Sequence, residues 1–142
     1  MSDMAPLTRD FFAVLQAVAA GADLETVVCV APFAGTVTAV TYIADTALTG
    51  ANTDSRTLSL INKGQAGSGT ASVAAKAFTA GVDAAAFDET AITLDTTDAM
   101  SDGVYEKRVV AAGDVLAFKS LHVGSTGLAD PGGVVKVTIS RD

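Results

Sequence analysis

Hydrophobic and polar residues alternate in several short stretches of the chain, which is the pattern of a strand with one buried face. Within residues 134–140, Val135 and Val137 fall on one face and polar residues fall on the other. Leu116 and Phe118 share a face in the same way. These stretches predict strands whose apolar faces meet inside a core.

From Leu24 onward the apolar stretches are separated by Gly, Asp, Asn and Pro, which favour turns. About eight strands at this spacing predict an all-β fold, namely an antiparallel, jelly-roll-like β-sandwich. The predicted strands cover residues 24–31, 36–44, 56–62, 72–79, 90–94, 104–110, 114–120 and 134–140.

The N-terminal segment follows a different pattern, because its apolar residues are spaced as on one face of a helix. Thr8 is a candidate N-cap and Gly21 a candidate stop signal. We therefore divide the chain into residues 1–23, a short helix or an extended arm, and residues 24–142, the β-sandwich domain. Such an arm could lay its apolar face on a neighbouring subunit instead of its own domain. Its candidate contact residues are Phe11, Phe12, Leu15 and Val18.

Two connections carry recognisable turn residues. Gly113 and Asp114 stand between two predicted strands, where a glycine with positive φ allows a hairpin. Pro131 and Gly132 fit a type II turn, because proline presets φ at the second position and glycine accepts positive φ at the third.

Composition and charge exclude several classes of function. The formal net charge is −7 and the nine basic residues are scattered, which argues against direct binding to nucleic acid. A single cysteine excludes an internal disulfide and a multi-cysteine metal site. The start of the chain lacks the pattern of a secretion signal, and its apolar runs are too short to cross a bilayer, so we expect an intracellular product without membrane contact.

Neither of two glycine-rich stretches fits a phosphate-binding loop. Residues 122–133, HVGSTGLADPGG, contain no Lys and run into a predicted strand instead of a helix. Residues 64–72 lack the glycine spacing of a dinucleotide site and also lead into a predicted strand. Both stretches are therefore interpreted as chain reversals, and no cofactor is predicted.

The sequence offers no clear reaction centre. His122 is the only histidine, and although Ser120 and Ser125 lie close to it in sequence, no nucleophile-elbow motif surrounds either serine. Cys29 lies in an apolar run, which favours an inert thiol. The acidic residues of 88–103 do not follow the spacing of a calcium-binding loop. We therefore predict a protein that works by contact, with no enzymatic activity and no metal.

Four stretches of the chain together resemble a group of small head proteins of tailed bacteriophages, of the decoration or minor capsid kind, from phages of actinobacteria and related hosts. The resemblance covers roughly residues 24 to 141 and rests on turn-and-strand patterns. The four stretches are APFAGTVTAVTYIAD (31–45), SRTLSLINKGQAGSGT (55–70), GDVLAFKS (113–120) and GSTGLADPGGVVKVTISR (124–141).

The resemblance implies a structural virion protein, made in the host cytoplasm, that binds the outer surface of the major capsid protein lattice and reinforces contacts between capsomers. It further implies a homo-oligomer, with a trimer favoured. In that setting the four apolar residues of segment 1–23 become candidate contacts to the capsid or to another subunit.

Two other classes of contact protein stay open. A carbohydrate-binding β-sandwich module or fibre head would share the fold, but such sites use exposed aromatic platforms and this chain has no Trp. A tail-tube or baseplate component would share the virion setting, and would be marked by long exposed hairpins and assembly into rings or tubes.

Overall fold

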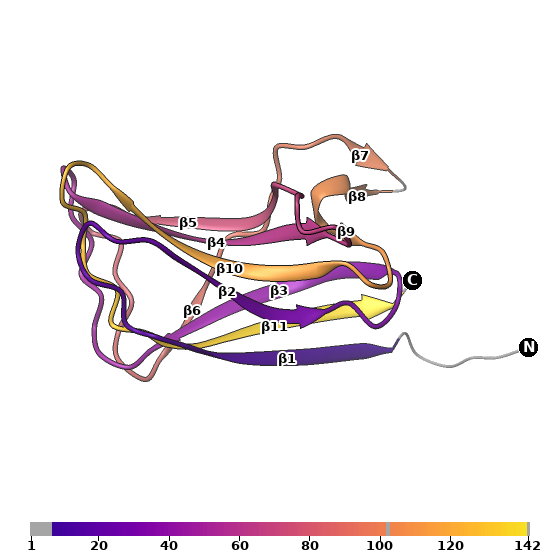
Figure 1. The fold of residues 1–142 in the computed structure, drawn as a ribbon, viewed down its shortest axis with the longest axis horizontal. Coiled ribbons are helices and arrows are strands. Elements are labelled where there is room, and N and C mark those ends of the chain that lie inside the picture. The colour runs from indigo at the N-terminus through magenta and orange to yellow at the C-terminus, as the bar shows by residue number, and fades with distance from the viewer. Residues whose placement is uncertain (1–6, 102, 142) are drawn as a thin grey trace, which may run out of the picture.

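The protein is an antiparallel β-sandwich, seen in a computed structural model that describes residues 7–101 and 103–141. The first sheet has the order β1-β11-β3-β6, and β9 also pairs with β3. Its strands are β1 (Thr8–Leu15), β11 (Gly133–Arg141), β3 (Gly35–Ala44), β6 (Glu89–Ala91) and β9 (Val109–Val110). Figure 1 shows the long strands running side by side along the molecule.

The second sheet has the order β2-β10-β4-β5. Its strands are β2 (Leu24–Val30), β10 (Val115–Val123), β4 (Ser55–Gly64) and β5 (Ala71–Phe78). A small hairpin of β7 (Met100–Ser101) and β8 (Val104–Tyr105) stands apart from both sheets, and a 3-10 turn, η1 (Glu106–Arg108), follows it.

The strand pairs are nested in sequence. β1 pairs with β11, β2 with β10, β3 with β6 and β4 with β5, and successive pairs alternate between the two sheets. A long antiparallel hairpin rolled up into two layers produces this order, which is that of a jelly roll. The predicted all-β, jelly-roll-like sandwich is thus confirmed, with β7, β8, η1 and β9 inserted before β10.

The core lies between the two sheets and is built by the alternation that the sequence predicts. Leu58 and Leu60 of the second sheet are fully buried, and so are Val135 and Val137 of the first sheet. The ring of Tyr42 stacks on that of Phe118 across the core, with centroids 6.3 Å apart. Inward-facing residues of both sheets thus fill one continuous interior.

One border of the sandwich is closed by the chain after β6. Ile92 N–H donates to the Val40 carbonyl in the first sheet at 2.8 Å. The next residue bonds to the second sheet, because the Thr93 carbonyl accepts the N–H of Ala75 in β5 at 2.9 Å. Segment 92–95 therefore bridges the two layers along β5.

The N-terminal helix prediction is wrong, because residues 8–15 form strand β1. The residues with helical spacing also fit a strand, since Phe11, Ala13 and Leu15 share its inward face. Pairing with β11 satisfies the backbone of the segment and settles which period applies. The segment is extended, as the alternative prediction had it, and it pairs within the first sheet of the sandwich.

Two further local predictions are wrong. The predicted strand 104–110 is broken by η1, and the predicted hairpin at Gly113 is instead a crossing from β9 in one sheet to β10 in the other. The positive φ expected at Gly113 is nevertheless present, at 93°. Local turn chemistry predicts a reversal of the chain but carries no information about which sheet the next strand joins.

Candidate contact surfaces

A buried polar network lies at the end of the sandwich where β10 joins β11. Arg56 Nη1 donates to Ser120 Oγ at 2.9 Å, and Ser120 Oγ donates to Asp130 Oδ2 at 2.7 Å. The Tyr42 hydroxyl, from the other sheet, donates toward Asp130 Oδ1 at 3.0 Å. Among residues 7–101 and 103–141, no buried side-chain nitrogen or oxygen lacks a hydrogen-bond partner. The polar groups inside this end are therefore occupied by one another.

Arg56 also ties together the loops of this end. Its Nε donates to the Leu128 carbonyl at 2.6 Å, and its Nη2 donates to the carbonyls of Ala19 and Ala22 at 3.1 and 3.0 Å. Burial lowers the pKa of Arg56, and the charges of Asp130 and Asp23 oppose that shift. The guanidinium thus acts as a cross-link between the β1–β2 and β10–β11 connections.

The glycine-rich stretch 122–133 is held against its own chain. The N–H groups of Thr126 and Gly127 donate to Asp54 Oδ1 at 3.1 and 3.3 Å. Gly132 has the expected positive φ, 81°, and a Cβ there would lie 2.7 Å from the Leu15 carbonyl oxygen. The stretch therefore uses its glycines for reversal and close packing, and its loop donors serve an internal carboxylate.

His122 pairs with an acid at the surface of the same end. Its Nδ1 lies 2.6 Å from Asp23 Oδ1, and its backbone N–H donates to the same oxygen at 2.9 Å. The His122 backbone N–H and then its side chain hold the pKa of Asp23 below the ordinary aspartate value. The nearby Ser120 hydroxyl is hydrogen-bonded to Arg56 and Asp130 and not to His122. This arrangement favours a structural link between two loops through His122 and Asp23 over a serine nucleophile with a histidine base.

Cys29 and the acids of 88–103 have structural surroundings. Cys29 is half-buried, and burial raises the pKa of its thiol to about 11, which leaves little thiolate at neutral pH. Asp95 accepts the Thr97 hydroxyl at 2.8 Å and the Asp98 N–H at 3.1 Å. Within the described part of the chain, no three His, Cys, Asp or Glu residues gather as metal ligands.

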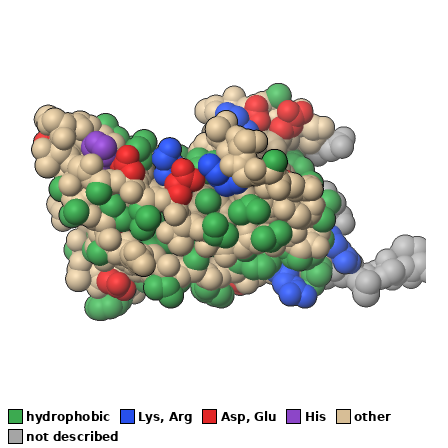
Figure 2. All heavy atoms as spheres, in the orientation of Figure 1, with side chains coloured by type: hydrophobic (Ala, Val, Ile, Leu, Met, Phe, Trp, Pro, Cys, Tyr) green, Lys and Arg blue, Asp and Glu red, His purple; other side chains and the backbone are tan. Residues whose placement is uncertain are grey.

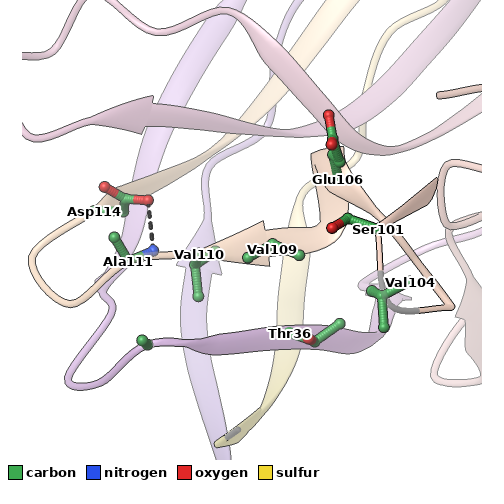
Figure 3. Close-up of a pocket in the computed structure, with 9 residues that line it drawn as sticks. Thr36, Ser101, Val104, Glu106, Val109, Val110, Ala111 and Asp114 are labelled. Carbon is green, nitrogen blue, oxygen red and sulfur yellow. Dashed lines mark hydrogen bonds between the residues drawn. The ribbon is translucent and has the colours of Figure 1, made fainter. Parts of the chain in front are cut away.

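A groove of about 850 Å³ lies at the opposite end, between the start of β3 and the insertion before β10. Figure 3 shows Val104, Val109 and Val110 beside it, with Asp114 at one end. Asp114 Oδ2 is engaged by the Ala111 N–H at 2.9 Å and by Asn62 Nδ2 at 3.0 Å. The lining of the groove is mainly apolar, and the Asp114 carboxylate supports the neighbouring turn.

The four predicted contact residues of the N-terminal segment do not share one exposed face. Leu15 and Val18 are buried in the core at 7% and 6% exposure, and Phe11 packs against the core. Phe12 alone points outward, with 63% of its surface exposed. Of the four, Phe12 is therefore the residue that a partner could contact in this conformation.

Phe12 belongs to an apolar area on the outer face of the first sheet. Val14 is 79% exposed. It lies opposite Val134 of β11, which in turn lies opposite Ile43 of β3, so the three residues form one apolar row across the sheet. Phe12 stands in the next row, beside Lys136, which pairs with the exposed Glu89 at 3.4 Å. We call Phe12, Val14, Val134 and Ile43 the outer-face patch.

Phe87 is a second exposed aromatic side chain, and sequence reasoning missed it. It is 82% exposed, and it has positive φ, 59°, an unfavourable conformation for a residue with a Cβ. Its N–H donates to the Ala44 carbonyl at 2.9 Å, which places it next to the end of β3. No pattern in the acidic and alanine-rich stretch around Phe87 marks it as exposed, because that depends on the bend of the chain.

No family model, curated protein or solved structure matches the chain. None of the helical turns in residues 7–101 and 103–141 is long and apolar enough to span a membrane.

Proposed function

We propose that the protein is a structural virion protein that binds the outer surface of a phage capsid and reinforces contacts between capsomers. The jelly roll is an architecture of viral capsid and lectin domains, so the fold is compatible with this role. Because one fold serves many functions, the proposal has to be supported by a surface of this chain.

The observation that carries the proposal is the exposed apolar surface on and beside the first sheet. Phe12, Val14 and Phe87 are each more than three-fifths exposed, with values of 63%, 79% and 82%. Exposed aromatic residues with polar neighbours are typical of protein contact surfaces. A strained, exposed Phe87 further supports a contact role, because strain in a native backbone tends to be kept at functional positions.

A lattice makes a modest contact sufficient. A standard stable interface buries about 800 Å² on each partner. A capsid repeats the same site many times, and a subunit that touches several capsomers, or several copies of itself, gains from multivalency. A homo-oligomer on the capsid, with the trimer implied by the sequence resemblance, would use this gain.

Co-sedimentation with purified capsids that lack their own decoration protein tests the proposal. We expect wild-type protein to bind with saturable occupancy, and Phe87→Ser and Phe12→Ser each to weaken binding at least about tenfold, since buried aromatic residues dominate interface energies. Val27→Ser is the matched control, because Val27 is equally exposed, at 63%, on a strand of the second sheet.

Wild-type protein that fails to sediment with capsids would contradict the capsid role. Equal loss of binding in the Val27→Ser variant would contradict the assignment of the contact to the first sheet. Capsid-independent binding to a glycan array, abolished by Phe87→Ser, would instead identify a carbohydrate-binding module.

A further inference from the structure

The border strands of the sandwich differ in how their free edges are protected. β6 is only three residues long. β5 is covered by segment 92–95, which bonds to it on both sides of Ala74. β2 meets β10 with a register shift, and its Glu25 forms an ion pair with Lys63 at 3.3 Å. Short length, cover, irregularity and charge are the usual ways in which native sheets prevent edge pairing.

β1 is neither short nor irregular, and over most of its length it carries no charge, although β2 of the second sheet lies close to it. It has eight residues, and its register with β11 runs from Thr8 to Leu15 without a shift, unlike the other long pairs. Its charged residues, Arg9 and Asp10, stand near one end. In the described part of the chain β1 pairs with β11 alone, and Figure 1 shows it at the lower border with no strand beyond it.

The register identifies the backbone groups that this edge offers. Arg141 N–H donates to the Leu7 carbonyl at 2.7 Å, so residues 7 and 141 form a hydrogen-bonded pair. Such pairs alternate in an antiparallel ladder. The N–H and C=O groups of Thr8, Asp10, Phe12 and Val14 therefore point away from β11, toward the open edge.

The side chains beside these groups are apolar where the edge is longest. Phe12 and Val14 are the exposed members of the outer-face patch and sit on the edge strand itself. Figure 2 shows hydrophobic side chains at the surface along the lower border of the molecule, where Figure 1 places β1. A long, regular and apolar edge is a template for another strand.

We propose that the β1 edge pairs with β1 of a second copy of this chain, antiparallel and centred on Phe11. This register uses all of the outward backbone groups, since Thr8 then faces Val14 of the other copy and Asp10 faces Phe12. Neither Arg9 nor Asp10 meets its own like charge, because both lie away from the centre. The two first sheets become one continuous sheet across a two-fold axis.

The proposal concerns self-association in free solution and does not depend on capsid binding. Two identical antiparallel strands satisfy each other, so the contact closes after two copies. It therefore favours a dimer over the trimer that the sequence resemblance implies. A third copy would find no β1 edge left to pair with.

Sedimentation equilibrium of the full chain over a range of concentrations is the first test. We expect a monomer–dimer equilibrium with a limiting mass of two chains. Val14→Pro should raise the dimer dissociation constant at least about tenfold, because it removes a donor from the open edge and adds a ring there, while the N–H that it replaces makes no bond to β11. Val134→Lys is the control, because it changes the same register row one strand inward and leaves the edge open.

A cross-linking experiment tests the register. In a Cys29→Ser background, the double variant Asp10→Cys, Phe12→Cys places unlike positions opposite each other, at about 5.5 Å between Cα atoms, which a disulfide can span. Mild oxidation should give a covalent dimer. Each single variant should give far less, because its cysteine faces a position that is not cysteine. Circular dichroism and thermal unfolding serve as controls that each variant is folded.

A monomer at all concentrations, or a trimer, overturns the proposal. So does a dimer that survives Val14→Pro or is lost equally in Val134→Lys, since the contact would then lie elsewhere or on the sheet face. A monomer whose capsid occupancy falls with Val14→Pro would mean that a capsid strand, and no second copy, occupies the edge. A two-chain mass that is sensitive to Val14→Pro, tolerant of Val134→Lys and cross-linked only in the double variant supports it.

Discussion

The two ends of the sandwich are held together by different means. At the end where β10 joins β11, loops are cross-linked by Arg56 and Asp130 inside the protein. At the opposite end the insertion before β10 is held by short strands and by Arg108, which donates to the Asp95 carbonyl at 2.7 Å and lies 4.9 Å over the Tyr105 ring. The same residue types, Arg, Tyr and Asp, are buried at one end and near the surface at the other.

This difference teaches where the stability of the fold depends on single side chains. A buried polar network is costly to break, because each orphaned group loses water without gaining a partner. Surface interactions of the same chemistry are screened and replaceable by water. Matched substitutions at the two ends should therefore have unequal effects on the free energy of unfolding.

The largest effect is expected from Arg56→Met. It removes four hydrogen bonds that the guanidinium makes and leaves Asp130 buried with less compensation, which should cost about 3 kcal/mol or more. Arg108→Met at the other end should cost about 1 kcal/mol or less. Urea unfolding followed by circular dichroism measures both. Similar losses would mean that the two ends are equally dependent on their arginines.

Tyr42→Phe should have the next largest effect. The variant keeps the stacking on Phe118 but deletes the hydroxyl that lies 3.0 Å from Asp130 Oδ1 and 3.1 Å from the Gly132 carbonyl. We expect a loss of about 1 to 2 kcal/mol. Tyr105→Phe, whose ring only supports Arg108 near the surface, should change stability by less than about 0.5 kcal/mol in the same assay. If Tyr42→Phe left the free energy of unfolding unchanged, this would contradict the structural role of the network.

Two variants at positions with positive φ should change stability in opposite directions. Phe87→Gly removes a Cβ at φ 59° and should stabilise the fold by up to about 1 kcal/mol, although it also removes the proposed contact side chain. Gly103→Ala at the other end adds a Cβ at φ 78° in open space and should destabilise by about 1 kcal/mol through conformation alone. Thermal midpoints that shift in the same direction for both variants would disprove this account.

The smallest effect concerns pH. The pKa of Asp23 is lowered chiefly by the His122 backbone N–H, and that of Asp95 chiefly by the Thr97 hydroxyl. A carboxylate with a lowered pKa in the folded state contributes stability above its unfolded pKa, near 4, and loses it as the pH falls through the folded value. Asp23→Asn and Asp95→Asn should each be slightly less stable than wild type at pH 7, with the difference vanishing toward pH 2. A difference that persists at pH 2 would exclude ionisation as its cause.

Most strands could be predicted from the sequence, because their evidence is local. Strand β11 alternates without interruption up to Ser140, and Gly132 and Gly113 adopt the positive φ that their turns required. The sequence left the first segment open between a short helix and an extended arm, because Phe11, Phe12, Leu15 and Val18 fit helical spacing while Phe11 and Leu15 also fit the spacing of a strand. Pairing with the distant residues of β11 decided between them.

The candidate surfaces depended still more on distant contacts. Arg56, Ser120 and Asp130 carry no shared motif, and they are separated by up to 74 residues in the chain before folding brings them together. The exposure of Phe87 and of the β1 edge likewise depends on how distant parts of the chain pack around them. Such a property belongs to the assembled sheets and has no signature in any one stretch of residues.

By itself the sequence determined that this chain is an antiparallel β-sandwich with glycine-dependent reversals, because alternation and turn residues act over a few neighbouring positions. Only the tertiary structure decided which strands lie at the borders, which polar groups are buried and which apolar side chains stay exposed. These features follow from contacts between residues far apart in sequence, since burial and pairing are properties of the packed layers.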